Sequence, residues 1–193
     1  MISAIILAAG ESKRMGQPKM LLPWGNRTVI EHVVNTFRNG GIKDILVVTG
    51  GAKEQVETAL AHYSVRITHN PAYASGEMLS SIQCGLREMP DTTQAALIGL
   101  GDQPQVQEST IRVICEAYET SRSSLIVPSF QMKRGHPWLL ARSLWNEILE
   151  LRSPSTPRDI LNKYSNAIHY VTVDTPTILA DLDTPEDYRN SHP

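Results

Sequence analysis

Residues 4–10 read Ala4-Ile5-Ile6-Leu7-Ala8-Ala9-Gly10, a short and uninterrupted apolar run that opens directly into a glycine. The run is far shorter than the roughly 20 residues that a membrane-spanning helix needs. Its length and composition are typical of a strand that is buried on both faces of a parallel sheet. The stretch therefore predicts a buried strand followed by a glycine loop, as expected at the start of an α/β fold.

The rest of the chain continues this alternation of apolar runs and amphipathic stretches. Further strands are expected over residues 44–49, 65–68, 95–99, 124–128, 136–140, 167–173 and 178–182. Helices are expected over residues 29–38, 53–61, 78–87, 108–120 and 142–151, with two short ones starting at Thr156-Pro157 and Thr184-Pro185. The alternation predicts a three-layer α/β/α, Rossmann-like fold with a mostly parallel central sheet. Because no linker or repeat interrupts the 193 residues, residues 1–193 are expected to form a single domain.

Composition excludes several classes of protein. Lys and Arg number 18 against 20 Asp and Glu, so the chain has no basic surplus for binding nucleic acid. No cationic segment precedes the first apolar run, which argues against a secretory signal, and we expect a cytoplasmic protein without membrane segments. Cys84 and Cys115 are too few for a disulfide framework, and no two of the six histidines have the i, i+4 spacing of a helical metal site.

The loop after the first strand concentrates glycines and positive charge. Its three cations are Lys13, Arg14 and Lys19. It is not a dinucleotide-binding fingerprint, because Ser12 and Met15 stand where that pattern needs glycine. It is not a P-loop either, because Gly10 and Gly16 are six residues apart. Backbone N–H groups exposed by glycine, together with cations, suit a triphosphate or pyrophosphate, and the alternative is a solvated turn with scattered surface charges.

Carboxylates follow two later strands of the predicted sheet. Asp102 lies in Gly101-Asp102-Gln103-Pro104, directly after a buried strand, where it could hold Mg²⁺ beside phosphate oxygens or simply form an Asx turn. Asp181 and Asp183 are two residues apart, which places both on one face of the end of the predicted strand 178–182. The alternative is that Asp183 or Thr184 caps the helix that follows.

Together these motifs resemble those of the molybdopterin nucleotidyltransferases, the MobA/MocA-like superfamily. The opening signature of that family is matched by Leu7-Ala8-Ala9-Gly10-x-Ser12-x-Arg14-Met15-Gly16-x-x-Lys19. Its later blocks are matched, in order, by Asn70-Pro71, Gly76-x-Met78-x-x-Ser81, Gly101-Asp102-Gln103-Pro104, Arg134-Gly135-His136-Pro137 and Asp181-Leu182-Asp183-Thr184-Pro185-Glu186-Asp187. The resemblance covers essentially the whole chain, and it implies the GT-A-like nucleotidyltransferase form of the Rossmann-like fold.

The resemblance also implies a reaction. Ala8-Ala9-Gly10 resembles the cytidylyltransferase branch, since the guanylyltransferase branch usually has Ala-Gly-Gly there, and the methyl group of Ala9 would narrow the base pocket in favour of a pyrimidine. The implied enzyme depends on Mg²⁺, transfers CMP from CTP to the phosphate of molybdopterin or molybdenum cofactor, and releases pyrophosphate. The implied partners are a nucleoside triphosphate, above all CTP, a molybdopterin-type acceptor, and a molybdenum hydroxylase that receives the product.

Residue roles follow from the same resemblance. The implied catalytic residues are Arg14, Lys19 and Asp102, with Lys19 on the α-phosphate and Arg14, helped by Lys13, on the β- and γ-phosphates. Mg²⁺ is expected on Asp102 and Asp183, with Asp181 as the alternative to Asp183. The nucleotide-binding residues are Leu7, Ala8, Ala9, Gly10, Ser12, Lys13, Arg14, Lys19, Asn70 and either Ser80 or Ser81. The acceptor-binding residues are Arg134, Gly135 and His136, while Trp24 and Trp138 either cover a flat ring or pack in the core.

Two other functions fit part of this pattern. A nucleotidyltransferase of the same fold that acts on a sugar or polyol phosphate would use the same first loop and the same Asp102. A non-catalytic carrier of molybdenum cofactor would need neither Lys19 nor Asp102, and the presence of both favours catalysis. A serine hydrolase is disfavoured because the chain has no Gly-x-Ser-x-Gly elbow.

Overall fold

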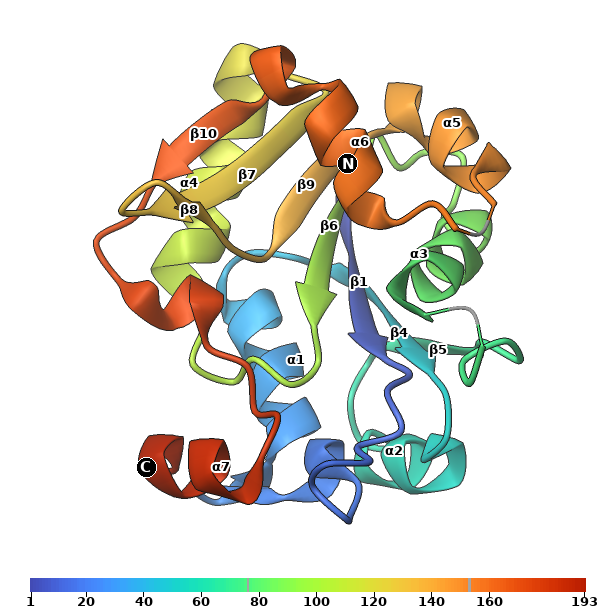
Figure 1. The fold of residues 1–193 in the computed structure, drawn as a ribbon, viewed down its shortest axis with the longest axis vertical. Helices are drawn as coiled ribbons and strands as arrows, with labels where there is room; N and C mark the ends of the chain where they lie inside the picture. The colour runs from blue at the N-terminus through green and yellow to red at the C-terminus, as the bar shows by residue number, and fades with distance from the viewer. Residues whose placement is uncertain (76, 153) are drawn as a thin grey trace.

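The N-terminal apolar run forms β1 (Ile2–Ala8), which lies in the interior of an eight-stranded sheet (Figure 1). The computed structural model describes residues 1–75, 77–152 and 154–193. β1 pairs in parallel with β4 (Asp44–Thr49) on one side and β6 (Ala95–Leu100) on the other. The remaining strands are β5 (Arg66–His69), β7 (Leu125–Phe130), β8 (Lys133–Arg134), β9 (Trp138–Ala141) and β10 (His169–Thr172).

The strand order is β10-β7-β9-β6-β1-β4-β5, with β8 paired to β7. β9 runs antiparallel to both β6 and β7, and β8 runs antiparallel to β7, whereas every other pairing in this sheet is parallel. The predicted, mostly parallel sheet is therefore confirmed. Parallel strands bring their carboxyl ends to one edge, where α/β proteins bind their ligands.

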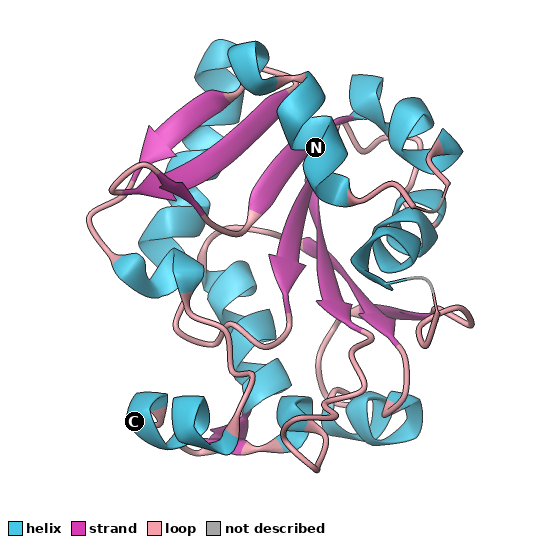
Figure 2. Ribbon diagram, viewed as in Figure 1, coloured by secondary structure: helices cyan, strands magenta, loops and turns pink. Residues whose placement is uncertain are grey.

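Helices cover both faces of the sheet (Figure 2). One face carries α1 (Val29–Asn39), α2 (Lys53–Ala59) and α4 (Glu108–Ser121), and the other carries α3 (Glu77–Arg87), α5 (Trp145–Glu150) and α6 (Pro157–Lys163). Successive residues of β1 point to opposite faces, so Ile6 packs in the core under the first three helices and Ile5 in the core under the other three. This arrangement confirms the three-layer α/β/α fold.

Capping residues explain where the C-terminal helices begin. Thr156 and Thr184 each form a capping box, the first with Asp159 and the second with Asp187, and a proline follows each threonine. The two short helices predicted at these positions are confirmed as α6 and α7 (Pro185–Ser191). The longer predicted helix over 142–151 is confirmed only from Trp145 onward, because its first residues form a 3-10 turn.

The predicted strand over 178–182 is wrong. Pro176 to Leu179 form a 3-10 turn instead, and the segment that follows is irregular. Thr175 caps this turn, and the Leu182 N–H donates to the carbonyl of Asp102, 3.1 Å away, rather than to a neighbouring strand. Ile178 and Leu182 are fully buried, so their apolar character reflects packing under a loop. A hairpin of β2 (Pro23–Trp24) and β3 (Arg27–Thr28) was not predicted.

The remaining sequence expectations concern the two cysteines, membrane-spanning helices and one glycine of the matched motifs. Both cysteines are free thiols and partly buried. Among the described residues, no helix has the length and apolar character to cross a membrane. Gly76, which belongs to one of the matched motifs, lies outside the described residues.

Candidate functional site

The loops after β1 and β6 meet at the carboxyl edge of the sheet. The Gly101 N–H donates to the carbonyl of Leu7, 2.9 Å away, which joins the loop after β6 to the end of β1. Between them lies a cavity of about 250 Å³, which we call the strand-end cavity. It is lined by Leu7, Ala9, Gly10, Lys19, Met20, Tyr73, Met78, Ser81, Leu100 and Asp102. Six of these residues are ones that the sequence singled out for nucleotide or metal binding, namely Leu7, Ala9, Gly10, Lys19, Ser81 and Asp102.

The first loop is pressed against the loop after β4. A Cβ atom placed on Gly50 would lie 2.3 Å from the carbonyl oxygen of Ala9, so no side chain fits between the two backbones. A backbone atom cannot swing away as a flexible side chain can. Gly50 is therefore required for the close approach that holds Ala9 at the cavity wall.

Replacing Gly50 by alanine is expected to lower the free energy of unfolding by about 1–3 kcal/mol, the usual cost of overpacking. Urea denaturation measures this change. Gly10→Ala is the matched control, because a Cβ atom at Gly10 meets nothing within 4 Å, so its unfolding free energy should change much less. Equal effects of the two substitutions would show that the contact with Ala9 is not what requires glycine at position 50.

An ionic cluster of Arg14, Lys19, Asp102 and Asp183 lies at the edge of the strand-end cavity. The Lys19 ammonium, whose side chain is only 10% exposed, donates to Oδ2 of Asp102 and to Oδ1 of Asp183, the latter 3.0 Å away. Arg14 Nη1 lies 3.2 Å from Oδ2 of the same Asp183. Burial by itself lowers the pKa of Lys19, but the two carboxylates more than compensate, so its pKa is raised and it is charged at neutral pH.

Local structure fixes this cluster from both ends of the chain. Ser12 has a left-handed backbone, with φ of 53°, and its hydroxyl accepts a hydrogen bond of 3.1 Å from the N–H of Lys19. Met15, Trp24 and Leu182 pack together in a small core beneath the first loop. The bond from Leu182 to the Asp102 carbonyl then holds the C-terminal segment, and with it Asp183, beside the loop after β6. Trp24 is thus a packing residue.

The two carboxylates of the cluster suit a divalent cation. Asp102 and Asp183 both bind one ammonium group, so their oxygens face a common space that already holds a positive charge. Asp181 instead accepts a bond of 2.7 Å from Gln103 Nε2, and its pKa is raised by burial and by the charge of Asp102. Within residues 1–75, 77–152 and 154–193 no group of three or more acidic, His or Cys side chains forms a ready-made metal site. Mg²⁺ commonly uses one or two carboxylates and takes its other ligands from phosphates and water.

The other residues implied for nucleotide binding fall into two groups. The buried Asn70 donates from Nδ2 to the hydroxyls of Ser80, at 2.8 Å, and Ser81, at 3.0 Å, but only Ser81 lines the strand-end cavity. Lys13 is different, because its exposed ammonium pairs with Glu11 at 2.8 Å. Ser81 therefore lies at the strand-end cavity, whereas Lys13 lies outside the ionic cluster.

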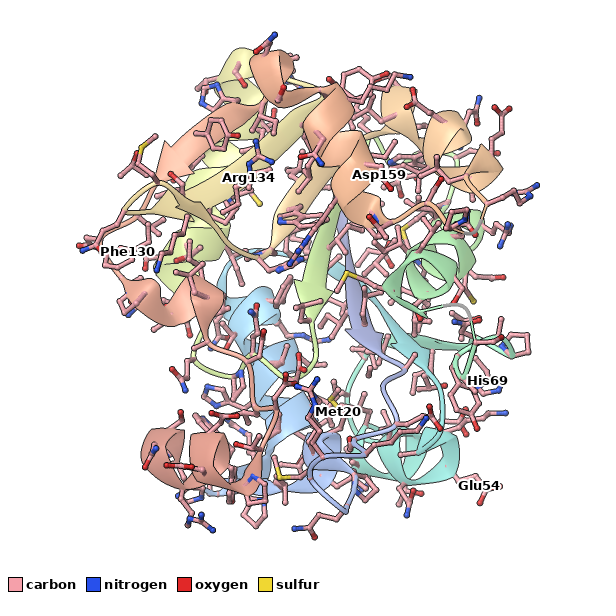
Figure 3. The ribbon with its side chains drawn as sticks, in the orientation of Figure 1. Met20, Glu54, His69, Phe130, Arg134 and Asp159 are labelled. Atoms are coloured by element: carbon pink, nitrogen blue, oxygen red, sulfur yellow. The ribbon has the colours of Figure 1, made fainter. Side chains whose placement is uncertain are left out.

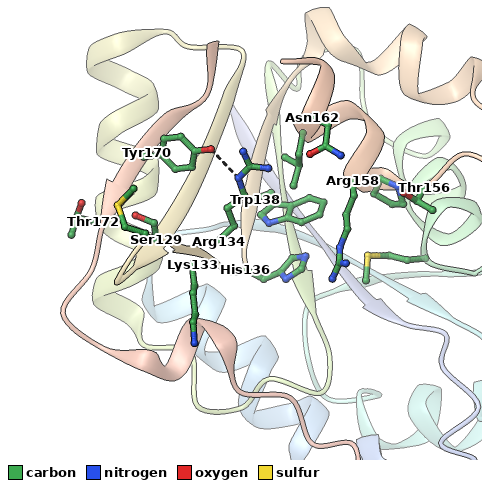
Figure 4. A pocket seen from close by; sticks show the side chains of 14 residues that line it. Ser129, Lys133, Arg134, His136, Trp138, Thr156, Arg158, Asn162, Tyr170 and Thr172 are labelled. Carbon is green, nitrogen blue, oxygen red and sulfur yellow. Dashed lines mark hydrogen bonds between the residues drawn. The ribbon is translucent and has the colours of Figure 1, made fainter. Parts of the chain in front are cut away.

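A second and larger cavity, of about 1010 Å³, lies between α6 and the strands β7 to β10 (Figure 4). We call it the large cavity. Met78 lines both this cavity and the strand-end cavity, so the two are neighbours. Figure 3 labels one lining residue of each, Arg134 in the upper half of the view and Met20 in the lower half.

Of the three residues that the resemblance implied for acceptor binding, Arg134 and His136 line the large cavity, but Gly135 does not. A Cβ atom on Gly135 would lie 2.4 Å from the carbonyl oxygen of Ile178, which explains the glycine by packing. The His136 ring stacks on Trp138 with centroids 4.3 Å apart. Burial, together with the charge of Arg158, lowers the pKa of His136 to about 4, so its ring is neutral at pH 7.

Comparison with known proteins agrees with this geometry. A family model described as the MobA-like NTP transferase domain matches residues 4–168. The chain belongs to the MobA-like NTP transferase family. It is 29% identical to the molybdenum cofactor cytidylyltransferase of Escherichia coli over 189 residues, which cover 97% of this chain and 93% of that protein. It is also 31% identical to a nicotine blue oxidoreductase of Paenarthrobacter nicotinovorans, over 74% of this chain and 72% of that one.

Solved structures of related proteins have the same fold. The Mycobacterium tuberculosis protein Rv0371c superposes with a TM-score of 0.86 at 27% identity, covering 98% of this chain and 96% of that one. A manganese complex of the same protein superposes with a TM-score of 0.80 at 25% identity, with the same coverage of both chains. This chain is therefore a MobA-like nucleotidyltransferase by family and fold, and a related protein binds a divalent metal.

Sequence reasoning missed several lining residues of the two cavities. In the strand-end cavity these are Met20, Tyr73 and Leu100, and in the large cavity they include Arg158, Asn162 and Tyr170. None of them stands in a motif whose spacing indicates a site. Tyr73 follows Asn70-Pro71, a pair that indicates only a turn. Arg158 follows Thr156-Pro157, a pair that indicates only the start of a helix.

Proposed function

We propose that this protein transfers CMP from CTP to the phosphate of a molybdopterin-type acceptor and releases pyrophosphate. The observation that carries the proposal is the ionic cluster at the strand-end cavity, which lies beside the large cationic cavity with Met78 as their shared wall. One cavity suits the nucleotide and the other suits the acceptor. The similarity to the Escherichia coli molybdenum cofactor cytidylyltransferase supports the same assignment.

The chemistry calls for positive charge more than for a base. The attacking phosphate is already an anion, so the barrier includes repulsion between two negatively charged groups, which positioning and neutralisation reduce. Lys19 binds the α-phosphate, and Arg14, exposed at the rim of the cluster, binds the β- and γ-phosphates with help from Lys13. Mg²⁺, held by Asp102 and Asp183, would neutralise further triphosphate charge.

Ala9 is proposed to select the base. It is buried and lines the strand-end cavity, and Gly50 holds its backbone in place, so its methyl group takes space that a purine would need. The backbone of Leu7, Ala8 and Gly10 and the Asn70–Ser81 pair would complete the base and ribose site. Ser12 contributes by holding Lys19.

Replacing Ala9 by glycine is expected to shift nucleotide selectivity toward GTP. One methyl group in a pocket typically changes selectivity by about tenfold or somewhat more. The measurement is the ratio of kcat/KM for CTP to kcat/KM for GTP, read from pyrophosphate release. Ala4→Gly is the matched control, because it removes the same methyl group from a buried alanine of β1 that does not line the cavity. An unchanged ratio in Ala9→Gly, or a wild-type preference for GTP, would contradict the role of the methyl group.

The overall assignment is tested by pyrophosphate release with CTP, GTP and ATP against a panel of acceptors. Turnover with CTP and molybdopterin is the expected result. Turnover only with a sugar or polyol phosphate would identify the same fold acting on a different acceptor. A protein that binds molybdenum cofactor without any turnover would instead be a carrier for a partner enzyme.

Two further expectations accompany this function. The product is proposed to pass to a molybdenum hydroxylase, since a dinucleotide form of the cofactor is useful only inside an enzyme that binds it. The site of action is proposed to be the cytoplasm, where nucleoside triphosphates are available and the thiols of Cys84 and Cys115 stay reduced.

A further inference from the structure

Asp183 reaches the ionic cluster on the segment that leads from β10 to α7 (Figure 1). We call residues 176–183 the C-terminal strap. It passes the loop after β6, where the Leu182 N–H donates to the carbonyl of Asp102, 3.1 Å away. This bond uses only backbone atoms, so it does not depend on which side chains the two residues carry. A second contact between the same two segments does depend on side chains.

That second contact joins Gln103 to Asp181. Gln103 Nε2 donates to Oδ1 of Asp181, 2.7 Å away. Gln103 is only 3% exposed, whereas Asp181 lies at the surface, so Gln103 is the fixed member of the pair. Asp181 stands two residues before Asp183, in a stretch of the strap that forms neither helix nor strand. Fixing the position of Asp181 therefore limits where Asp183 can lie.

Stability does not explain a glutamine at position 103. The Oε1 atom of its amide is buried without a hydrogen-bond partner among the described residues. A buried acceptor without a partner lowers stability, and an apolar side chain of similar size would avoid that loss. Asp181 lies at the surface and could exchange its bond to Gln103 for a bond to water. The pair thus adds little to the free energy of unfolding, and its contribution is a fixed position for the strap.

The position of the strap matters once the nucleotide is bound. In the free protein Lys19 and Arg14 both bond to Asp183, at 3.0 and 3.2 Å. The proposed reaction takes both cations to the triphosphate, which leaves Asp183 positioned by its own segment. Hydrogen bonds that orient a metal ligand strengthen metal binding. The bond between Gln103 and Asp181 orients the strap without using either cation.

We propose that Gln103 is a positioning residue for the metal: through Asp181 it fixes the strap, and so keeps Asp183 in place for a divalent cation. The described residues that line the two cavities do not include Gln103, so it acts through Asp181 rather than on the nucleotide. Asp181 is then the partner of Gln103 and not a metal ligand. This inference rests on the proposed function, because it takes Asp102 and Asp183 as the metal ligands.

The test measures Mn²⁺ affinity by electron paramagnetic resonance, without nucleotide or turnover. Gln103→Met keeps the size of the side chain and removes the donor. It is expected to weaken Mn²⁺ binding about tenfold, the lower end of the usual effect of losing a residue that orients a metal ligand. Its urea midpoint should be no lower than that of the wild type, because the unpaired Oε1 is removed as well. Gln105→Met is the matched control, because it makes the same change in the same loop, at a side chain with no hydrogen bond to the strap among the described residues.

Two further variants separate the hydrogen bond from the charge of Asp181. Asp181→Asn and Asp181→Ala lose the same charge, but only asparagine keeps an oxygen that can accept from Gln103 Nε2. Asp181→Ala is expected to bind Mn²⁺ about tenfold more weakly than Asp181→Asn. Because Asp181 lies at the surface, both variants are expected to fold even if Gln103→Met does not, and urea denaturation checks this.

Several results would overturn the inference. These are unchanged Mn²⁺ affinity in Gln103→Met, equal losses in Gln103→Met and Gln105→Met, or equal affinities of Asp181→Asn and Asp181→Ala. A loss of affinity in Gln103→Met that comes with a lower urea midpoint would assign Gln103 to stability instead. The proposed function fails separately, by absence of CTP turnover in a wild-type protein whose variants change Mn²⁺ affinity as expected.

Discussion

Asp102→Asn is expected to lower kcat/KM for pyrophosphate release by about a thousandfold, at the upper end of what losing one electrostatic group in an active site costs. The substitution keeps the shape of the side chain and removes its charge. It takes away one of the two carboxylates that share Lys19, and with it half of the proposed metal site. Stopped reactions that follow pyrophosphate, at several Mg²⁺ concentrations, measure the effect.

Asp181→Asn is the matched control for this experiment. Asp181 is a neighbouring carboxylate, but it binds Gln103 rather than Lys19 and does not line either cavity. Its asparagine variant should keep activity within about tenfold of wild type. Retained activity in Asp102→Asn, or equal losses in both variants, would mean that Asp102 does not hold the metal. Urea denaturation separates a loss of function from a loss of fold.

The sequence was enough to predict most of the sheet, because a parallel sheet leaves a clear local signature. Strands buried on both faces have a continuous apolar run, which covers residues 4–8 of β1 and 45–48 of β4. The same apolar pattern led to the wrong prediction of a strand over residues 178–182. Ile178 and Leu182 are buried there beneath a loop, and the Leu182 N–H donates to the Asp102 carbonyl in another loop. Burial alone cannot tell a strand from an irregular segment that is packed just as tightly.

The candidate site was predictable only where topology or family resemblance linked distant residues. Lys19 bonds to Asp102 and Asp183 across 83 and 164 residues, separations that no spacing rule covers. The carboxyl ends of parallel strands explain why the loops after β1 and β6 meet. The spacing of the C-terminal aspartates singled them out, but only the resemblance linked them to Asp102. Neither topology nor resemblance pointed to Arg158 or Tyr170. They line the large cavity from α6 and β10.

Lys19→Met is expected to change two quantities in opposite directions. The turnover number should fall about a hundredfold with little change in KM for CTP, because Lys19 is proposed to act where charge develops in the transition state. Affinity for Mn²⁺ in the absence of nucleotide should rise. The Lys19 ammonium and a divalent cation compete for the same two carboxylates, so removing the ammonium leaves two carboxylates without their cation.

The expected gain in Mn²⁺ affinity is about 5- to 150-fold, the usual range of coupling between two bound groups. Electron paramagnetic resonance of Mn²⁺ measures it directly and needs no turnover. Lys163→Gln is the control, because Lys163 pairs with Glu147 on the surface and should leave Mn²⁺ affinity unchanged. Unchanged Mn²⁺ affinity in Lys19→Met would mean that the metal does not use the Asp102–Asp183 pair. The expected gain would mean that Lys19 holds the two carboxylates together until metal and nucleotide arrive, and then becomes available to the α-phosphate.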